Sequence, residues 1–191
     1  IRGGESLETA HRLSVIVLDK TGTITAGRPS LTDVIPAPDA GVSENELLRL
    51  AASAERHSEH PVAAAIVRGA IDRALVLAEP SRFQIVVGQG VDATIDGRTV
   101  LIGKPGLLAE RGIAMTLAAR AAELAAVGRT TVLVAIDGRD AGVIAVADGV
   151  RAESKAGIDR LHALGLRVVM MTGDNRPTAE AVGRIVGVDE V

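Results

Sequence analysis

Two short apolar runs predict buried strands that each end at a polar loop. Residues 13–18 are almost all apolar and lead into Asp19, and residues 166–171 lead into Thr172. Ahead of the second run, residues 150–164 carry apolar side chains three apart on one face, which is typical of an amphipathic helix. Pro177 favours the start of a further helix because proline suits the first helical turn. Strand, loop and helix repeated in this way predict a doubly wound α/β domain with a parallel sheet.

The middle of the chain has a different pattern. Helices are predicted over 43–56, where Ser43 and Glu46 form a capping signal, and over 61–77, 105–111 and 117–127; short strands are predicted over 83–87, 91–95, 99–102, 131–136 and 141–147. Glycine-containing turns separate several of these strands and favour antiparallel hairpins. The pattern predicts an α+β domain (27–144) inserted into the α/β domain (1–26 and 145–191), with joins near Gly27 and Ala145.

The amino-acid composition excludes several classes of function. The 191 residues have a net charge of −3, no cysteine and a single aromatic residue, Phe83. This balance provides neither the basic surface nor the aromatic platforms that nucleic acids require, so no nucleic-acid partner is expected. Thiolate metal sites are excluded, and the apolar runs are too short to span a bilayer, so these residues are expected to be soluble.

The segment Asp19-Lys20-Thr21-Gly22-Thr23 is the strongest chemical signal. A carboxylate at the carboxyl end of a parallel strand faces the crevice where α/β sheets bind ligands. Such a carboxylate can attack a γ-phosphoryl group and form an acyl phosphate. Gly22 lets backbone N–H groups approach phosphate, and the threonines supply hydroxyl donors. A solvated turn after a core strand is the alternative interpretation.

A second phosphate-binding loop is predicted at Thr172-Gly173-Asp174, which follows the second strand. By itself this tripeptide fits an ordinary strand-to-helix turn equally well. Its position at the end of a strand parallel to the first one favours a shared site.

Together these motifs resemble those of P-type ATPases, a family with the haloacid dehalogenase-like fold and an inserted nucleotide-binding domain. The resemblance implies that Asp19 accepts the phosphoryl group from ATP and that Asp19 and Thr21 bind Mg²⁺, Thr21 through its carbonyl. It also implies that Lys20, Thr172, Gly173 and Asp174 belong to the catalytic site. Soluble phosphatases of the same fold usually carry a second aspartate where this chain has Thr21. Without that acid–base group the phosphoenzyme is expected to persist.

The segment Ser58-Glu59-His60-Pro61 resembles the histidine–proline motif of heavy-metal pumps. In that family the histidine packs against the adenine part of ATP, and an acidic residue shortly before it, here Glu55, lies nearby. The alternatives are a capping or surface histidine, or an accidental metal pair of His57 with His60.

Gly88 and Gly90 match the family's glycine loop for the nucleotide, although a strand glycine pair is often only a bulge. The chain departs from the family twice: Lys104 stands where asparagine is usual, and Asp92 where some members have a third glycine. Lys104 is therefore assigned to the ATP site as a charged contact to phosphate.

The resemblance covers the whole chain but only part of a pump. Residues 1–18 resemble the segment after the metal-binding membrane helix; the actuator and membrane domains, a phosphate-binding lysine and a further aspartate loop are expected outside the chain. The parent is thus expected at the cell membrane, with these residues on its cytoplasmic face and the transported metal bound elsewhere. Copper is favoured over zinc, cadmium and cobalt. Two alternatives remain: a free haloacid dehalogenase-like phosphatase and a non-catalytic nucleotide-binding module.

Overall fold

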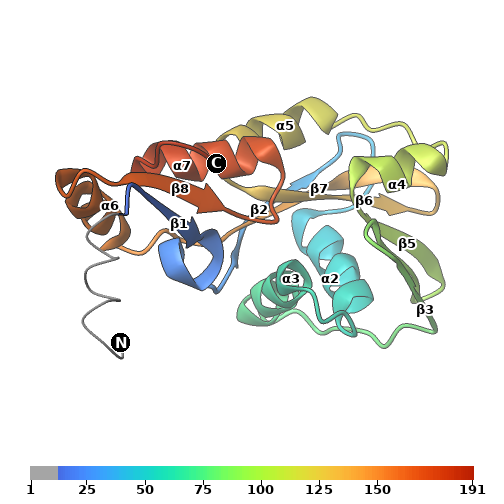
Figure 1. Cartoon of the computed structure of the whole chain (residues 1–191). Helices are drawn as coiled ribbons and strands as arrows, with labels where there is room; N and C mark the ends of the chain where they lie inside the picture. Colours follow the sequence, from blue (N-terminus) through green and yellow to red (C-terminus); the bar gives the residue numbers. More distant parts are fainter. Residues whose placement is uncertain (1–12) are drawn as a thin grey trace.

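The computed structural model describes residues 13–191, which form two lobes joined by two chain crossings (Figure 1). The smaller lobe contains β1 (Val15–Asp19), the turn η1 (Lys20–Ile24), α6 (Ser154–Ala163), β8 (Arg167–Met171) and α7 (Arg176–Val186). The strands β1 and β8 pair in parallel, from Val15 opposite Arg167 to Asp19 opposite Met171. Both predicted strands and both predicted helices of this lobe are confirmed.

The two faces of this small sheet differ. Ile158 of α6 and Val182 of α7 are buried against Val168 and Met170, so both helices cover the same face. On β1, Val17 remains 56% exposed. The expected likeness of residues 1–18 to a membrane-proximal segment falls mainly outside the described residues.

The larger lobe is a six-stranded antiparallel sheet in the order β2-β7-β6-β5-β4-β3. Its strands are β2 (Ser30–Pro36), β3 (Arg82–Val86), β4 (Gly90–Ile95), β5 (Arg98–Gly103), β6 (Thr130–Ile136) and β7 (Arg139–Ala147), and its helices are α2 (Glu44–Glu55), α3 (Pro61–Asp72), α4 (Pro105–Glu110) and α5 (Ala118–Ala126). One face packs on α2 and α3, and the other packs on α4 and α5. The lobe is therefore the predicted α+β arrangement of helices on an antiparallel sheet.

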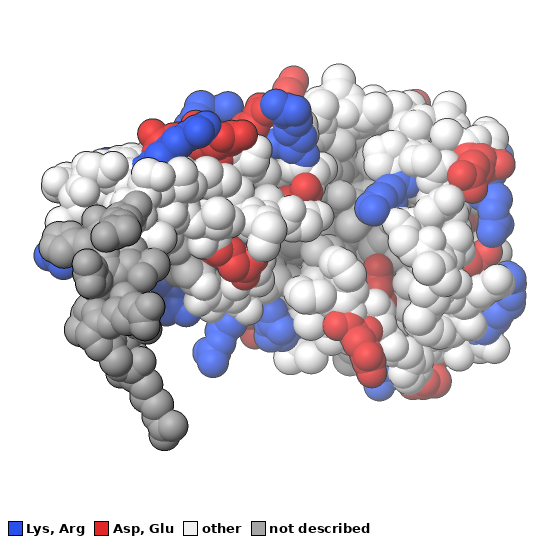
Figure 2. All heavy atoms as spheres, viewed as in Figure 1, with Lys and Arg blue, Asp and Glu red and all other residues white. Residues whose placement is uncertain are grey.

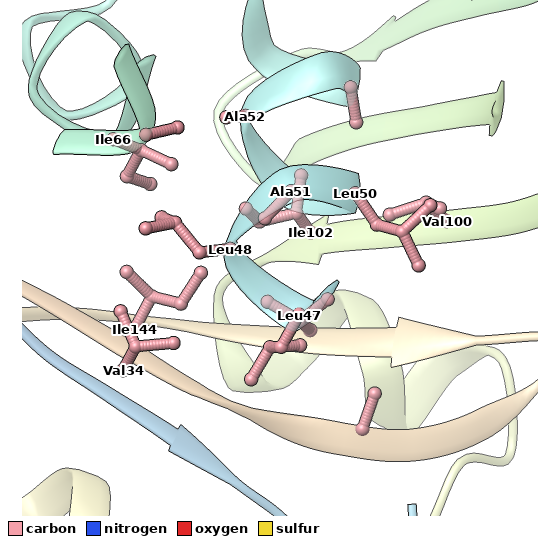
Figure 3. Packing of buried hydrophobic residues seen from close by; sticks show 14 of the residues in the cluster. Val34, Leu47, Leu48, Leu50, Ala51, Ala52, Ile66, Val100, Ile102 and Ile144 are labelled. Atoms are coloured by element: carbon pink, nitrogen blue, oxygen red, sulfur yellow. The ribbon is translucent and has the colours of Figure 1, made fainter. Parts of the chain in front are cut away.

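The main core lies between α2, α3 and the sheet (Figure 3). Leu47, Leu48 and Leu50 of α2 are completely buried, as are Ile66 of α3 and Ile144 of β7. Burying a side chain of this size contributes about 1.5–3 kcal/mol. The near absence of aromatic residues is thus offset by closely interleaved aliphatic ones.

Helix α2 begins as predicted, because the Ser43 hydroxyl accepts a hydrogen bond from the Glu46 N–H at 3.2 Å. Helix α3 ends at Asp72, earlier than the predicted residue 77. Ala74 adopts a left-handed conformation (φ 55°), which stops the helix, and Leu75 then packs against the core.

Strand β2 is absent from the sequence prediction. Its seven residues contain Asp33 and end in Pro36, and the pairing with β7 is interrupted by a bulge between Leu31 and Asp33. These features hide the alternation of apolar and polar residues on which strand prediction depends.

The lobes also touch away from the crossings, where α5 packs on α7. The Thr178 hydroxyl at the start of α7 donates to the Arg129 carbonyl at 3.1 Å, and the Arg184 guanidinium reaches the Ala126 carbonyl at 3.4 Å. On the face shown in Figure 2, acidic and basic side chains are interspersed and form no large patch of one sign. Within residues 13–191, none of the helices has the length and apolar character needed to cross a bilayer.

Candidate functional site

Asp19 is the last residue of β1 and lies directly across from Met171, the last residue of β8. The loops that follow these two strands, η1 and 172–175, therefore leave the same edge of the sheet. In η1 the chain turns sharply: Gly22 has a φ of +78°, and the Thr25 N–H donates to the Lys20 carbonyl at 2.9 Å. The structure thus brings together the two motifs predicted to share a phosphate site.

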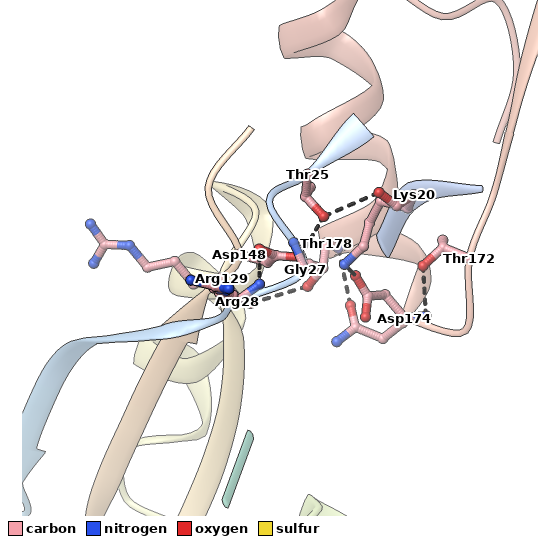
Figure 4. A network of polar contacts seen from close by, with 10 residues as sticks. Lys20, Thr25, Gly27, Arg28, Arg129, Asp148, Thr172, Asp174 and Thr178 are labelled. Atoms are coloured by element: carbon pink, nitrogen blue, oxygen red, sulfur yellow. Dashed lines mark hydrogen bonds and ion pairs between the residues drawn. The ribbon is translucent and has the colours of Figure 1, made fainter. Parts of the chain in front are cut away.

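Lys20 is oriented toward the second loop (Figure 4). Its side chain is buried, and its Nζ lies 2.5 Å from Asp174 Oδ2. The Asp174 N–H in turn donates to the Thr172 hydroxyl at 3.2 Å, and the Asn175 side chain caps α7 by accepting from the Thr178 N–H at 3.0 Å. An ion pair this sheltered is costly to break, because a partner left alone would be a buried charge. Lys20 and Asp174 therefore fasten the two loops to each other.

The residues that remain exposed or partly exposed at this edge of the sheet offer carboxylate, hydroxyl and backbone groups. Asp19, Thr21 and Gly173 are exposed, and Thr172 is half-buried. Mg²⁺ prefers a site with one or two protein carboxylates completed by water and substrate phosphate. Asp19 and Thr21, both exposed at this edge, offer a carboxylate and a backbone carbonyl of the kind that such a site uses. Among residues 13–191, no group of three or more His, Asp or Glu side chains could hold a metal by itself.

In the larger lobe, Glu55 at the end of α2 is a buried carboxyl group. Burial raises its pKa to about 7, and a hydrogen bond from Ser58 opposes this only in part. A group with this pKa is present in both protonated and ionised forms at neutral pH. Strongly shifted pKa values cluster at functional sites, although buried structural groups also show them.

His60 is the N-cap of α3, in agreement with the predicted helix start at residue 61. Its ring Nδ1 accepts a hydrogen bond from the Val62 N–H at 3.2 Å. This contact assigns the ring proton of the neutral form to Nε2. His57 is held separately: its ring lies edge-on to Phe83 and its Nε2 contacts Glu79 at 2.6 Å. One nitrogen of each ring is thus occupied by a different partner, Glu79 for His57 and the Val62 N–H for His60.

Gly88 and Gly90 flank the turn between β3 and β4. Gly88 has a φ of +71°, which favours glycine. At Gly90 a Cβ atom would stand 2.1 Å from the Ile102 carbonyl oxygen, so the neighbouring backbone leaves room only for glycine. The Lys104 N–H donates to the Gln89 carbonyl at 2.9 Å, which places Lys104 beside the same turn.

Helix α2 connects the two parts of this region. It packs over β4 and β5, and Arg49 in its first half contacts Asp96 at the far end of β4. Its C-terminal end lies toward β3, where His57 meets Phe83. Glu55 therefore lies at the end of α2 that points toward β3, the strand that leads into the turn at Gly88. The five predicted ATP residues lie in the larger lobe and the phosphorylation motifs in the smaller one.

Two charged residues at the connection between the lobes were not predicted from the sequence. Asp148 and Arg151 lie in the second crossing and bind the first one. Their only signal in the sequence is that they follow the buried run 141–147. By contrast, Asp92 is a buried departure from the resemblance: its carboxylate lies 3.4 Å from Arg82 and 3.3 Å from Arg111, so it joins β3 to the end of α4.

Comparison with known proteins identifies the family to which the chain belongs. The model for haloacid dehalogenase-like hydrolases matches residues 13–191. The chain belongs to the haloacid dehalogenase-like hydrolase family. Within that family, it is 46% identical to a copper-exporting P-type ATPase from Bacillus subtilis (strain 168), over all of this chain and 24% of that protein.

Solved structures agree with this placement. A zinc-transporting PIB-type ATPase in the E2.Pi state matches the whole chain at 38% identity with a TM-score of 0.78, over 31% of its own length. The N-domain of HMA6, a copper-transporting P-type ATPase, matches 62% of this chain and 98% of its own length at 30% identity, with a TM-score of 0.52. The predicted resemblance to heavy-metal P-type ATPases and the predicted haloacid dehalogenase-like fold are confirmed. The chain spans about a quarter of the length of the curated relatives it matches.

Proposed function

We propose that these residues are the ATP-binding and aspartyl-phosphorylation portion of a heavy-metal-transporting P-type ATPase. The observation that carries the proposal is the position of Asp19, which ends β1 in register with the end of β8. A carboxylate there stands beside two loops suited to phosphate, and the chain is similar throughout to named P-type ATPases.

In the proposed reaction, an Asp19 carboxylate oxygen attacks the γ-phosphorus of ATP. The new oxygen–phosphorus bond forms as the bond to the β,γ-bridging oxygen breaks, and ADP leaves. Thr172 and Gly173 would donate hydrogen bonds to the transferred group, since such donors act where charge develops. Mg²⁺ on Asp19 and the Thr21 carbonyl would neutralise phosphate charge.

ATP is assigned to the larger lobe through Glu55, His60, Gly88, Gly90 and Lys104. The bare backbone at the two glycines allows close approach of a ligand, and the Lys104 ammonium offers a charge-based contact to phosphate. Because the phosphorylation motifs lie in the other lobe, ATP must bridge the lobes when it reacts. The division into 1–26 with 145–191 and 27–144 is proposed on the same grounds. Strand β7 extends the larger lobe's sheet to Ala147.

The transported metal is proposed to be copper, because the similar curated proteins are named as copper exporters. Zinc is the second candidate, given the similarity to a zinc-transporting pump. The actuator and membrane domains are the proposed partners, with the chain on the cytoplasmic side of the membrane.

The test is phosphorylation of the full-length protein with γ-labelled ATP. Wild type should form a hydroxylamine-sensitive phosphoprotein, and Asp19→Asn should form none while ATP affinity stays within about twofold, because only the nucleophile is removed. Asp159→Asn, an exposed aspartate of α6, is the matched control and should label normally. Labelling that persists in Asp19→Asn would refute the assignment. Turnover of p-nitrophenyl phosphate without a lasting phosphoprotein would favour the phosphatase, and ATP binding without either activity would favour the binding module.

A further inference from the structure

The two crossings between the lobes lie side by side. The first runs from the end of η1 to β2, and the second runs from β7 to α6. Thr25 and Val150 form an isolated antiparallel bridge, and the Ala26 N–H donates to the Gly149 carbonyl at 2.9 Å. A contact that fixes the second crossing therefore also fixes the end of η1, the turn that follows Asp19.

Asp148 binds the side of the first crossing that leads into the larger lobe (Figure 4). Its carboxylate accepts from the Gly27 N–H at 3.1 Å, the Arg28 N–H at 3.0 Å and the Thr25 hydroxyl. Three donors on one carboxylate hold this segment in one conformation.

Arg151 binds the side that leads back to Asp19. Its Nε donates to the Thr25 carbonyl at 3.0 Å, its Nη2 to the Gly22 carbonyl at 2.9 Å, and its backbone N–H to the Ile24 carbonyl at 3.0 Å. Within residues 13–191, no carboxylate forms a salt bridge with Arg151. Its planar fork is therefore used to hold neutral backbone oxygens of the loop, a geometry that a lysine cannot reproduce.

The contact to Gly22 has a direct consequence for the loop. In a trans peptide the carbonyl and the following N–H point in opposite directions. Anchoring the Gly22 oxygen on Arg151 therefore fixes the Thr23 N–H so that it points away from that side chain. Gly22 has a positive φ, and the space that a Cβ atom would occupy there is open.

We infer that Arg151 is a positioning residue for phosphoryl transfer: it orients the backbone of the Asp19 loop and couples that loop to the crossing held by Asp148. The inference rests on the proposed function, since it concerns the same reaction. Arg151 itself touches neither Asp19 nor the predicted ATP residues. Its removal should slow the transfer step without weakening ATP binding.

The experiment measures the rate of acyl-phosphate formation in the full-length protein by rapid quenching. Arg151→Ala should be at least tenfold slower than wild type, with a KM for ATP within twofold. Millimolar guanidinium should restore part of the rate, whereas ammonium at the same concentration should not. Arg151→Lys should remain slow because it keeps the charge but loses the fork. Arg160→Ala, an exposed arginine in the last turn of α6, is the matched control and should behave as wild type.

A second measurement does not depend on phosphorylation. Backbone order parameters of Gly22 and Thr23 in the 191-residue chain should be near 0.85 in wild type and fall below about 0.6 in Arg151→Ala. Unchanged order parameters, full activity in Arg151→Ala, or full activity in Arg151→Lys would each overturn the inference. If wild type forms no acyl phosphate, the proposed function fails, and the order parameters still decide whether Arg151 anchors the loop.

Discussion

Replacing Glu55 by glutamine tests whether the larger lobe carries an unfavourable buried charge. Burial raises the pKa of Glu55 from 4.5 to about 7. The folded state therefore holds this proton more tightly than the unfolded chain, so the folded state is penalised once the pH is high enough to remove it. The penalty is absent well below pH 4.5, grows as the pH rises toward 7, and is complete above 7. A change from 4.5 to about 7 corresponds to about 3 kcal/mol.

Glu55→Gln removes the charge and keeps the shape. The free energy of unfolding of the variant relative to wild type should rise by roughly 2–3 kcal/mol between pH 5 and pH 8, less what is lost from the Ser58 hydrogen bond. Since the chain has neither Trp nor Tyr, urea unfolding is followed by circular dichroism. Carbon NMR of the glutamate carboxyls should show one midpoint near 7 that disappears in the variant.

Glu59→Gln is the matched control. Glu59 lies in the connection that follows Glu55 and is exposed, so its replacement should leave the free energy of unfolding close to that of wild type at both pH values. If no carboxyl titrates near 7, or if Glu55→Gln gains no stability relative to wild type on going from pH 5 to pH 8, the account of Glu55 as a buried, largely uncompensated carboxyl is wrong.

Three further predictions concern other parts of the chain. Gly90→Ala should unfold at a lower temperature and lose ATP affinity, because its Cβ would stand 2.1 Å from the Ile102 carbonyl oxygen; an unchanged melting curve by circular dichroism would contradict this. His60→Ala should weaken ATP binding several-fold, a loss on the order of 1 kcal/mol if the ring stacks on the base, and calorimetric titration measures it; equal affinity would exclude the stacking role. Hydrogen exchange should be faster at residues 15–18 than at 132–136, because within residues 13–191 β1 pairs with one strand whereas β6 pairs with two; equal protection would contradict this ranking.

Most elements could be predicted because their signals are local. The apolar segments that form β1 and β8 are short and bounded by polar loops. The capping signal at Ser43 predicts the start of α2. Strand β2 could not be found this way, because Asp33 and a bulge break its alternation and its partner β7 lies more than a hundred residues away. Strand propensity is decided largely by the neighbours that a strand acquires in the sheet.

For the candidate site, too, the sequence predicts local features but not the contacts between residues far apart in the chain. Asp19 and the loop at Thr172 were predictable because each loop follows a recognisable strand. The pairing of Lys20 with Asp174 was not, since 154 residues separate them and nothing in either segment specifies the partner. Glu55 was assigned by position in a motif, but its raised pKa depends on how completely the folded lobe buries it.

The sequence predicts least about the connection between the lobes, because the contacts there join residues that are far apart in the chain. Arg151 and Gly22 are 129 residues apart. They meet because Thr25 bridges to Val150 and because Ser30 at the start of β2 pairs with Ala147 at the end of β7. That pairing closes the larger lobe as a loop with its two ends adjacent, and the side chain of Asp148 then satisfies backbone N–H groups that no strand partner reaches. Because β2 is absent from the sequence prediction, the contacts of Asp148 and Arg151 could not be predicted either. The register between β2 and β7 sets the distance between the crossings, so a shift in that register would separate the guanidinium from the loop that carries the nucleophile.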